Sequence, residues 1–240
     1  GSFAYWPNES SSNPWSTAYA GFFLTKAKEM GYQVNANVLS RWSGYLLKVV
    51  RMWNPSNANW TYSNYMQAYN LYVLAVANQA DLPAMNRLKE FEGMDTQSRW
   101  LLASAYAIIG KKDIANKLVF NVKANLNSYY ASYYGSQIRD VAFMLQALVA
   151  LGQDGKAFDM AKKLSTLLND QTYYQTQSTA MGIIALADYA RGMKHQGMDF
   201  SIRIGSDKPE DIKSVLPLYS HSTLGIETDK KIEVKNNISD

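Results

Sequence analysis

Residues 16–192 carry apolar side chains at steps of three and four, and this period most strongly limits what the chain can fold into. Leu39, Trp42 and Leu46 illustrate the spacing, which places apolar side chains on one face of a helix. The pattern predicts consecutive amphipathic helices joined by short connections. The expected helices are Tyr19–Met30, Val38–Trp53, Tyr65–Ala80, Pro83–Phe91, Gln97–Ile109, Ile114–Leu126, Ile138–Leu151, Lys156–Leu168 and Thr179–Arg191.

Residues that start or end helices occur where the period predicts boundaries. Asn13 and Asp95 precede helical segments and can accept hydrogen bonds from free backbone N–H groups. Gly110, Gly152 and Gly192 each follow an apolar segment, where a left-handed C-cap is favoured. These glycines recur about every forty residues, a spacing that suits one helical hairpin per repeat.

Two kinds of helix alternate along the chain. One kind is rich in alanine and other small residues along its whole length, as in STAYAGFFLTKA and RDVAFMLQALVALG. The other carries lysine and asparagine on one face, as in NVLSRWSGYLLKVV and KAFDMAKKLSTLL. Five helices of the first kind and four of the second predict an inner and an outer ring of helices.

This arrangement predicts an all-α fold, which is either an α/α toroid or a helical solenoid. A toroid of six hairpins would need about three more helices, so we expect it to be incomplete at its N-terminus.

The last part of the chain changes from helical to strand periodicity. Residues 200–204 and 231–235 alternate apolar and polar side chains. These strands are too few for an independent sheet. We therefore expect a helical domain at 1–194 and the start of a β-sandwich-type domain at 195–240.

Composition excludes several classes of function. The formal charge is +4, but the basic runs are only lysine pairs, so no nucleic-acid partner is expected. An apolar run of about 20 residues does not occur, so no direct membrane insertion is expected. The chain has no cysteine, and its two histidines, His195 and His221, are far apart. No metal site, cofactor or catalytic residue is therefore predicted.

Tyrosine pairs lie near the loops that precede inner helices. Clustered tyrosines at one rim of a toroid could stack on sugar rings or contact a protein partner. The alternative is that they pack between loops and helix ends. The candidate interaction rim consists of Tyr129, Tyr130, Tyr133, Tyr134, Tyr173 and Tyr174.

An enzymatic interpretation would use charged residues at the starts of inner helices. A glycosidase needs two carboxyl groups within about 5–10 Å, and a lyase needs a base such as tyrosine with an arginine nearby. Asp95, Arg99, Arg139 and Asp140 are the candidates. A simpler interpretation makes Asp95 an N-cap and Arg139 with Asp140 a local ion pair.

Short motifs at both ends of the helical region match one known pattern. Residues 1–7 read GSFAYWP, residues 13–19 read NPWSTAY, residues 26–34 read KAKEMGYQV and residues 176–180 read TQSTA. This sequence resembles bacterial alpha-2-macroglobulins. In that family a Gly-x-Phe-x-x-Trp-Pro loop leads into a Pro-Trp-x-Thr-Ala-Tyr helix that ends in Gly-Tyr-x-Val.

The resemblance implies an α/α toroid shared with terpene cyclases and prenyltransferase β-subunits, followed by β-domains. It implies a non-catalytic structural and interaction domain of an exported protein that entraps proteases. Proteases and neighbouring β-domains would be the partners, and the protein would be periplasmic or on the cell surface, with a role in host–microbe interaction. A lipid anchor would belong to the parent chain. The family's Cys-x-Glu-Gln thioester motif is absent from these residues. The alternative function is a carbohydrate-active toroid enzyme, either a polysaccharide lyase or a glycosidase.

Overall fold

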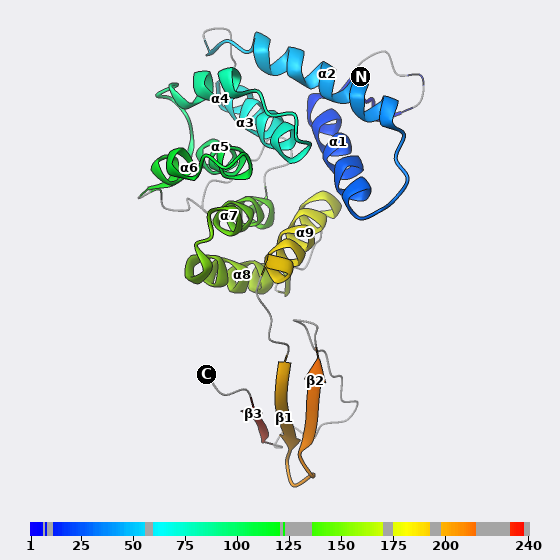
Figure 1. The fold of residues 1–240 in the computed structure, drawn as a ribbon, viewed down its shortest axis with the longest axis vertical. Helices are drawn as coiled ribbons and strands as arrows, with labels where there is room; N and C mark the ends of the chain where they lie inside the picture. Colours follow the sequence, from blue (N-terminus) through cyan, green and yellow to red (C-terminus); the bar gives the residue numbers. More distant parts are fainter. Residues whose placement is uncertain are drawn as a thin grey trace. The chain divides into compact units, whose positions relative to one another are not determined.

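A computed structural model of the protein describes residues 1–6, 8, 12–55, 60–120, 122, 136–169, 175–192, 198–214 and 231–237, with the side chains of 60–63 left out. These residues form nine α-helices and three β-strands (Figure 1). The chain forms two compact units, Gly1–Tyr189 and Ala190–Asp240. The prediction of an all-α fold of toroid type with a short β segment is confirmed. The predicted nature of the two domains stays a prediction.

Nine helices follow one another in the first unit, as the sequence pattern predicted. The helices of the inner kind are α1 (Pro14–Glu29), α3 (Trp60–Val76), α5 (Thr96–Ile108), α7 (Gln137–Leu151) and α9 (Thr176–Gly192). The helices of the outer kind are α2 (Ala36–Met52), α4 (Leu82–Lys89), α6 (Lys112–Val119) and α8 (Asp154–Asn169).

Packing and burial distinguish the two kinds of helix. α3 packs between α1 and α5, and α5 packs against α7, while α2, α4, α6 and α8 lie on the outer side (Figure 1). In α5, 10 of 13 residues are buried, whereas in α8 only 3 of 16 are buried. Small side chains allow α5 to approach neighbours on several sides. The alternation of small-residue helices with lysine-bearing helices therefore determines which helices form the core.

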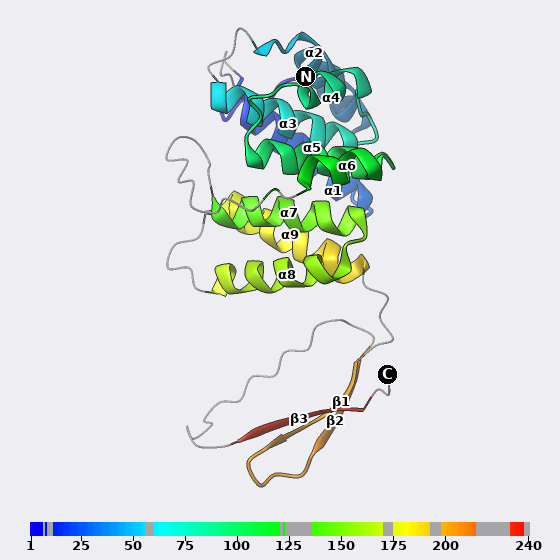
Figure 2. The same ribbon diagram turned by 90° about the vertical axis from the view of Figure 1, so that its left-hand side faces the viewer.

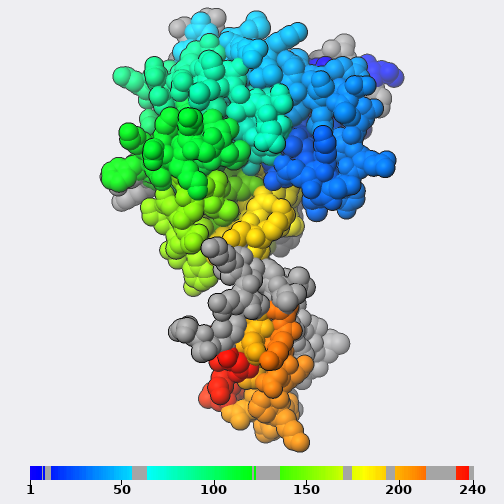
Figure 3. Space-filling view, viewed as in Figure 1, coloured from blue at the N-terminus to red at the C-terminus, as the bar shows by residue number. Residues whose placement is uncertain are grey.

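Helix α9 closes the inner helices into a ring. Its Gly182 lies so close to α7 and α8 that a Cβ there would be 3.0 Å from Ile138 and 3.4 Å from Leu168. On its other side Gln177 bonds to Trp15 of α1. Figure 3 shows the surface of α9 between those of α1 and α8. In Figure 2 the helices α7 and α9 begin on the same side of the unit.

Most predicted helix boundaries agree with the structure. The side chains of Asn13 and Asp95 accept hydrogen bonds from the backbone N–H groups of Ser16 and Ser98 and cap α1 and α5. Gly110 and Gly152 have φ values of 77° and 73°, the left-handed conformation expected of C-caps.

Three predicted helix ends are wrong. Helix α3 ends at Val76 rather than at Ala80, and Asn78 has a positive φ of 57°. Gly192 is the last residue of α9 rather than a left-handed cap. Helix α6 ends at Val119, before the predicted Leu126, because Phe120 adopts an extended conformation with φ −62° and ψ 122°.

The second unit contains a small antiparallel sheet. Its strands are β1 (Met198–Ile204), β2 (Glu210–Ser214) and β3 (Ile232–Asn236), in the order β2-β1-β3. Phe200 pairs with Ile212, and Ile202 pairs with Val234, so apolar side chains share one face. The alternation in 200–204 and 231–235 predicted β1 and β3, whereas β2 lacked a comparable pattern.

Candidate functional site

The predicted tyrosine rim cannot be placed, because all six of its residues lie outside the described part of the chain. His195 and His221 also lie outside it. Among the residues that the structure describes, no cluster of three or more His, Cys, Asp or Glu side chains could hold a metal ion. No described helix is long and apolar enough to cross a membrane.

The structure brings together three of the four charged residues that an enzymatic interpretation would use. The pKa of Asp140 responds to the charges of Arg139 and Asp95, so these three lie close at the N-terminal ends of α5 and α7. Asp95 also caps α5 through a 2.7 Å hydrogen bond from the backbone N–H of Ser98. Arg99 instead donates from Nε to the carbonyl of Met94 at 3.2 Å.

Arg139 does not form the local ion pair with Asp140 that the sequence suggested. Its guanidinium lies over the ring of Trp15 at 4.6 Å and over the ring of Tyr65 at 5.3 Å. Successive residues on a helix point in different directions, so Arg139 and Asp140 face different neighbours. Arg139 is only 4% exposed, so a full positive charge is enclosed among aromatic rings.

Asp140 is the second enclosed charged group. Burial raises its pKa to about 6, although the charge of Arg139 and a hydrogen bond from Gln97 act in the opposite direction, and Asp95 raises it further. A carboxyl group with this pKa changes between its protonated and its ionised form near neutral pH. The group formed by Trp15, Tyr65, Gln97, Arg139 and Asp140 is called the polar hub below.

Aromatic stacking holds the polar hub in place. Trp15 stacks on Tyr69 with ring centroids 4.6 Å apart and on Tyr65 with centroids 6.2 Å apart. Its indole Nε1 donates to Gln177 of α9 at 2.7 Å. The hub therefore joins α1, α3, α5, α7 and α9 at the ends where these helices begin.

The chemistry of the hub is poorly suited to proton abstraction. A lyase that uses a tyrosine base needs a phenol that loses its proton readily, yet burial raises the pKa of Tyr65 far above its ordinary value. A glycosidase needs two available carboxyl groups, and Asp95 is engaged as an N-cap. The arrangement is better suited to holding a polar group than to transforming one.

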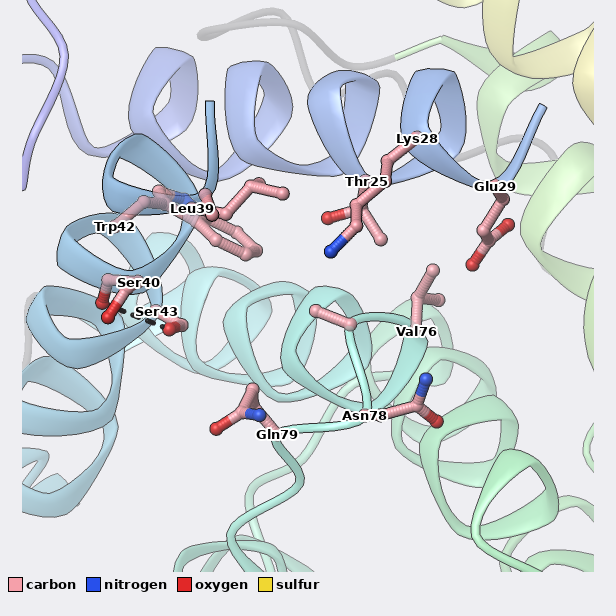
Figure 4. A pocket seen from close by; sticks show the side chains of 12 residues that line it. Thr25, Lys28, Glu29, Leu39, Ser40, Trp42, Ser43, Val76, Asn78 and Gln79 are labelled. Atoms are coloured by element: carbon pink, nitrogen blue, oxygen red, sulfur yellow. Dashed lines mark hydrogen bonds between the residues drawn. The ribbon is translucent and has the colours of Figure 1, made fainter. Parts of the chain in front are cut away.

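A separate cleft lies at the opposite ends of α1 and α3, beside the start of α2 (Figure 4). Its volume is about 480 Å³. Lys28 and Glu29 of α1 point into it above Val76 and Asn78 (Figure 4). Leu39 adds an apolar wall. The lining thus combines both charges with amide and apolar groups.

Sequence reasoning missed Tyr65 and Gln97 as parts of the hub, and Trp15 entered it only as part of the motif NPWSTAY. A usable signal was present, because polar residues interrupt otherwise apolar inner helices. Asn64, Gln67 and Asn70 recur at steps of three along α3, and all three are buried. Polar side chains in a fully buried helix need partners, and Gln67 donates to the backbone carbonyl of Val50 on α2 at 3.0 Å.

Comparison with known proteins gives one consistent relationship. No family model matches the chain. The alpha-2-macroglobulin of Escherichia coli K12 is 30% identical over 159 residues, which cover 62% of this chain and 10% of that protein. The chain therefore spans about a tenth of the length of its curated relative.

Solved structures of bacterial alpha-2-macroglobulins share the fold. The native E. coli protein matches 98% of this chain with a TM-score of 0.67 at 20% identity, over 14% of its own chain. The Salmonella protein reacted with methylamine matches 98% with a TM-score of 0.65 at 21% identity, over 15% of its own chain. The sequence match and the shared fold agree with the resemblance seen in the motifs, and this chain is similar to the bacterial alpha-2-macroglobulins in sequence over 62% of its length and in fold over 98%.

Proposed function

We propose that this chain is a non-catalytic helical domain, with adjoining β structure, of an exported inhibitor that entraps proteases. The observation that carries the proposal is the 30% identity to E. coli alpha-2-macroglobulin over 159 residues. One of the matching structures is the E. coli protein activated by porcine elastase, with a TM-score of 0.65. Proteases and neighbouring β-domains of the same chain are the proposed partners.

In this proposal the helical unit moves as one rigid body. Its inner helices are joined across the ring by buried aromatic and polar contacts, which suits a domain that moves as a whole when a protease cleaves elsewhere in the protein. The proposed site of action is the periplasm or the cell surface, with any lipid anchor on other parts of the protein, and the proposed setting is host–microbe interaction.

Entrapment has a specific kinetic test. The protein encoded by the complete reading frame would be mixed with elastase, and hydrolysis of casein and of a small chromogenic peptide would be measured. Entrapment predicts that casein cleavage falls while peptide cleavage persists, because a trapped protease still admits small substrates. Equal loss of both activities, or loss of neither, contradicts entrapment. Elastase without the inhibitor is the control, since it sets the uninhibited rates of both reactions.

A covalent version of the same function needs a thioester outside these 240 residues, because they contain no cysteine. Covalent adducts between inhibitor and elastase would then appear on denaturing gels and disappear after methylamine treatment. Absence of adducts would exclude the covalent version and leave entrapment to be judged by the casein measurement.

A further inference from the structure

The cleft at the C-terminal ends of α1 and α3 has walls that the fold holds in place. It lies where α1, α2 and α3 pack against one another. On its lining, Trp42 is 1% exposed and donates from Nε1 to the carbonyl of Thr17 at 2.9 Å. Thr25 is 8% exposed and donates to the carbonyl of Gly21 at 2.8 Å. The volume of about 480 Å³ is therefore a fixed feature, and it falls within the range of about 300–1,000 Å³ for ligand sites.

Two side chains of opposite charge enter this cleft without neutralising each other. Lys28 and Glu29 both point into it (Figure 4). Among the residues that the structure describes, Lys28 forms no ion pair, and Glu29 pairs with Lys26 at 3.1 Å. Lys26 also contacts Asp188 of α9 at 3.4 Å, so it is shared between two carboxylates. Glu29 therefore remains able to accept from a second donor, and Lys28 remains able to donate to an anion.

The separation of these two charges favours one length of ligand. Because Lys28 and Glu29 form no ion pair, their charged atoms lie more than 4.0 Å apart. In a free amino acid a single Cα atom separates the ammonium from the carboxylate, so the two charges lie within about 4 Å. A dipeptide extends over about 7 Å, and its terminal charges can therefore reach side chains that stand farther apart. The charges of the cleft favour a zwitterion of this longer kind.

The rest of the lining suits the middle of a dipeptide. Asn78 and Gln79 lie on the wall across from Lys28 (Figure 4). Each carries a carboxamide with both a donor and an acceptor, which are the groups that a peptide bond needs as partners. Leu39 and Val76 add apolar surface against which an aliphatic side chain can pack. The lining therefore matches a dipeptide with an apolar side chain.

We propose that the cleft binds a short apolar peptide with free termini, of the size of a dipeptide. Its carboxylate accepts from Lys28 Nζ, its ammonium donates to Glu29, and its peptide bond contacts the carboxamides of Asn78 and Gln79. The walls of the cleft are set before the ligand arrives, which lowers the cost of binding. The proposal goes beyond protease entrapment and does not depend on it.

Nuclear magnetic resonance of the ¹⁵N-labelled protein tests the site. The backbone N–H signals of Asn78 and Gln79 would be followed during titrations with Ala-Leu and with Leu-Ala at low ionic strength. At least one of the two dipeptides should shift both signals saturably, with a dissociation constant of about 1 mM for a ligand of this size. Free leucine serves as a shorter zwitterion, and sucrose serves as a neutral polar ligand. Tighter binding of either, or no saturable shift with either dipeptide, overturns the proposal.

Variants and blocked peptides show which charges carry the binding. Lys28→Gln should weaken the affinity for the preferred dipeptide about fivefold, but it should not change the affinity for the same dipeptide with an amidated C-terminus. The amidated form has no carboxylate with which Lys28 could pair. Glu29→Gln should act in the same way, with the N-acetylated dipeptide as the insensitive ligand. Lys48→Gln and Glu90→Gln are the matched controls, because they remove the same charges at exposed positions outside the cleft.

Two further results would contradict the proposed contacts. One is wild-type protein that binds the amidated and acetylated dipeptides as tightly as the free dipeptide. The other is an equal loss of affinity in Lys28→Gln and Lys48→Gln. Lys28 and Glu29 are exposed, so both variants should fold. If either does not, the blocked peptides still decide on the wild-type protein.

Discussion

The indole Nε1 of Trp15 donates a 2.7 Å hydrogen bond to Oε1 of Gln177, which joins the first inner helix to the last. Near the other ends of the same two helices, Lys26 and Asp188 approach within 3.4 Å. Trp15 is 2% exposed, whereas the Lys26 pair is partly open to water. The buried contact is therefore the stronger of these two contacts between α1 and α9.

Replacing Gln177 should weaken this closure. Gln177→Leu removes the acceptor of the Trp15 indole, and the loss should lower the free energy of unfolding by about 1–2 kcal/mol. Urea unfolding followed by tryptophan fluorescence measures the change. Gln153→Leu is the matched control, because Gln153 makes an equally short 2.7 Å bond to Asn116 in an exposed position. Equal effects of the two substitutions would contradict the special role of the buried bond.

The contact between α1 and α2 depends on a glycine. A Cβ at Gly21 would lie 1.8 Å from the ring of Trp42, which is 1% exposed and cannot move freely. Gly21→Ala should therefore lower the free energy of unfolding by about 2 kcal/mol or more. Gly44→Ala on α2 is the control, since nothing lies within 4 Å of its added Cβ. This second change should raise stability by about 0.5–1 kcal/mol through helix propensity, as thermal unfolding would show.

The raised pKa of Asp140 predicts a pH-dependent stability. The folded carboxyl has a pKa of about 6, above its ordinary 3.8, so the folded state binds more protons than the unfolded state between these values. The free energy of unfolding therefore falls as the pH rises through this window. Asp140→Asn removes the titration, so the stability of the variant relative to wild type should increase by about 1–3 kcal/mol between about pH 4 and pH 7. Urea unfolding at both pH values measures it, and a constant difference would contradict the assignment.

Asp81 should behave in the opposite way. Burial alone would raise its pKa, but hydrogen bonds from Arg51 and from the backbone N–H of Ala84, with the charges of Arg51 and Arg87, lower the pKa below 3.8. This carboxylate therefore contributes stability above about pH 4 that is lost as the pH falls through its folded pKa. Asp81→Asn should be less stable than wild type at neutral pH by about 1 kcal/mol, because Arg51 is largely exposed. The difference should shrink in urea unfolding at about pH 3, and a deficit that persists there would point to lost packing instead.

Local patterns in the sequence were sufficient for much of the fold. The apolar period, the N-caps Asn13 and Asp95, and the C-caps Gly110 and Gly152 depend on neighbouring residues alone, so all of them were predictable. The contrast between small-residue and lysine-bearing helices also predicted which helices are inner and which are outer. The early end of α6 at Val119 was not predictable, because the apolar period continues beyond it.

The polar hub was decided only by the tertiary structure. The sequence determined that Arg139 and Asp140 begin an inner helix, and their adjacency suggested a local pair. Adjacent side chains on a helix diverge, so Arg139 instead reaches Trp15 and Tyr65 on two other helices. Burial at the meeting point of the helices then raises the pKa of Asp140, a property that no local pattern carries. The sequence by itself determined the helices and their order, while the packing of their first turns determined the site, because its partners come from distant parts of the chain.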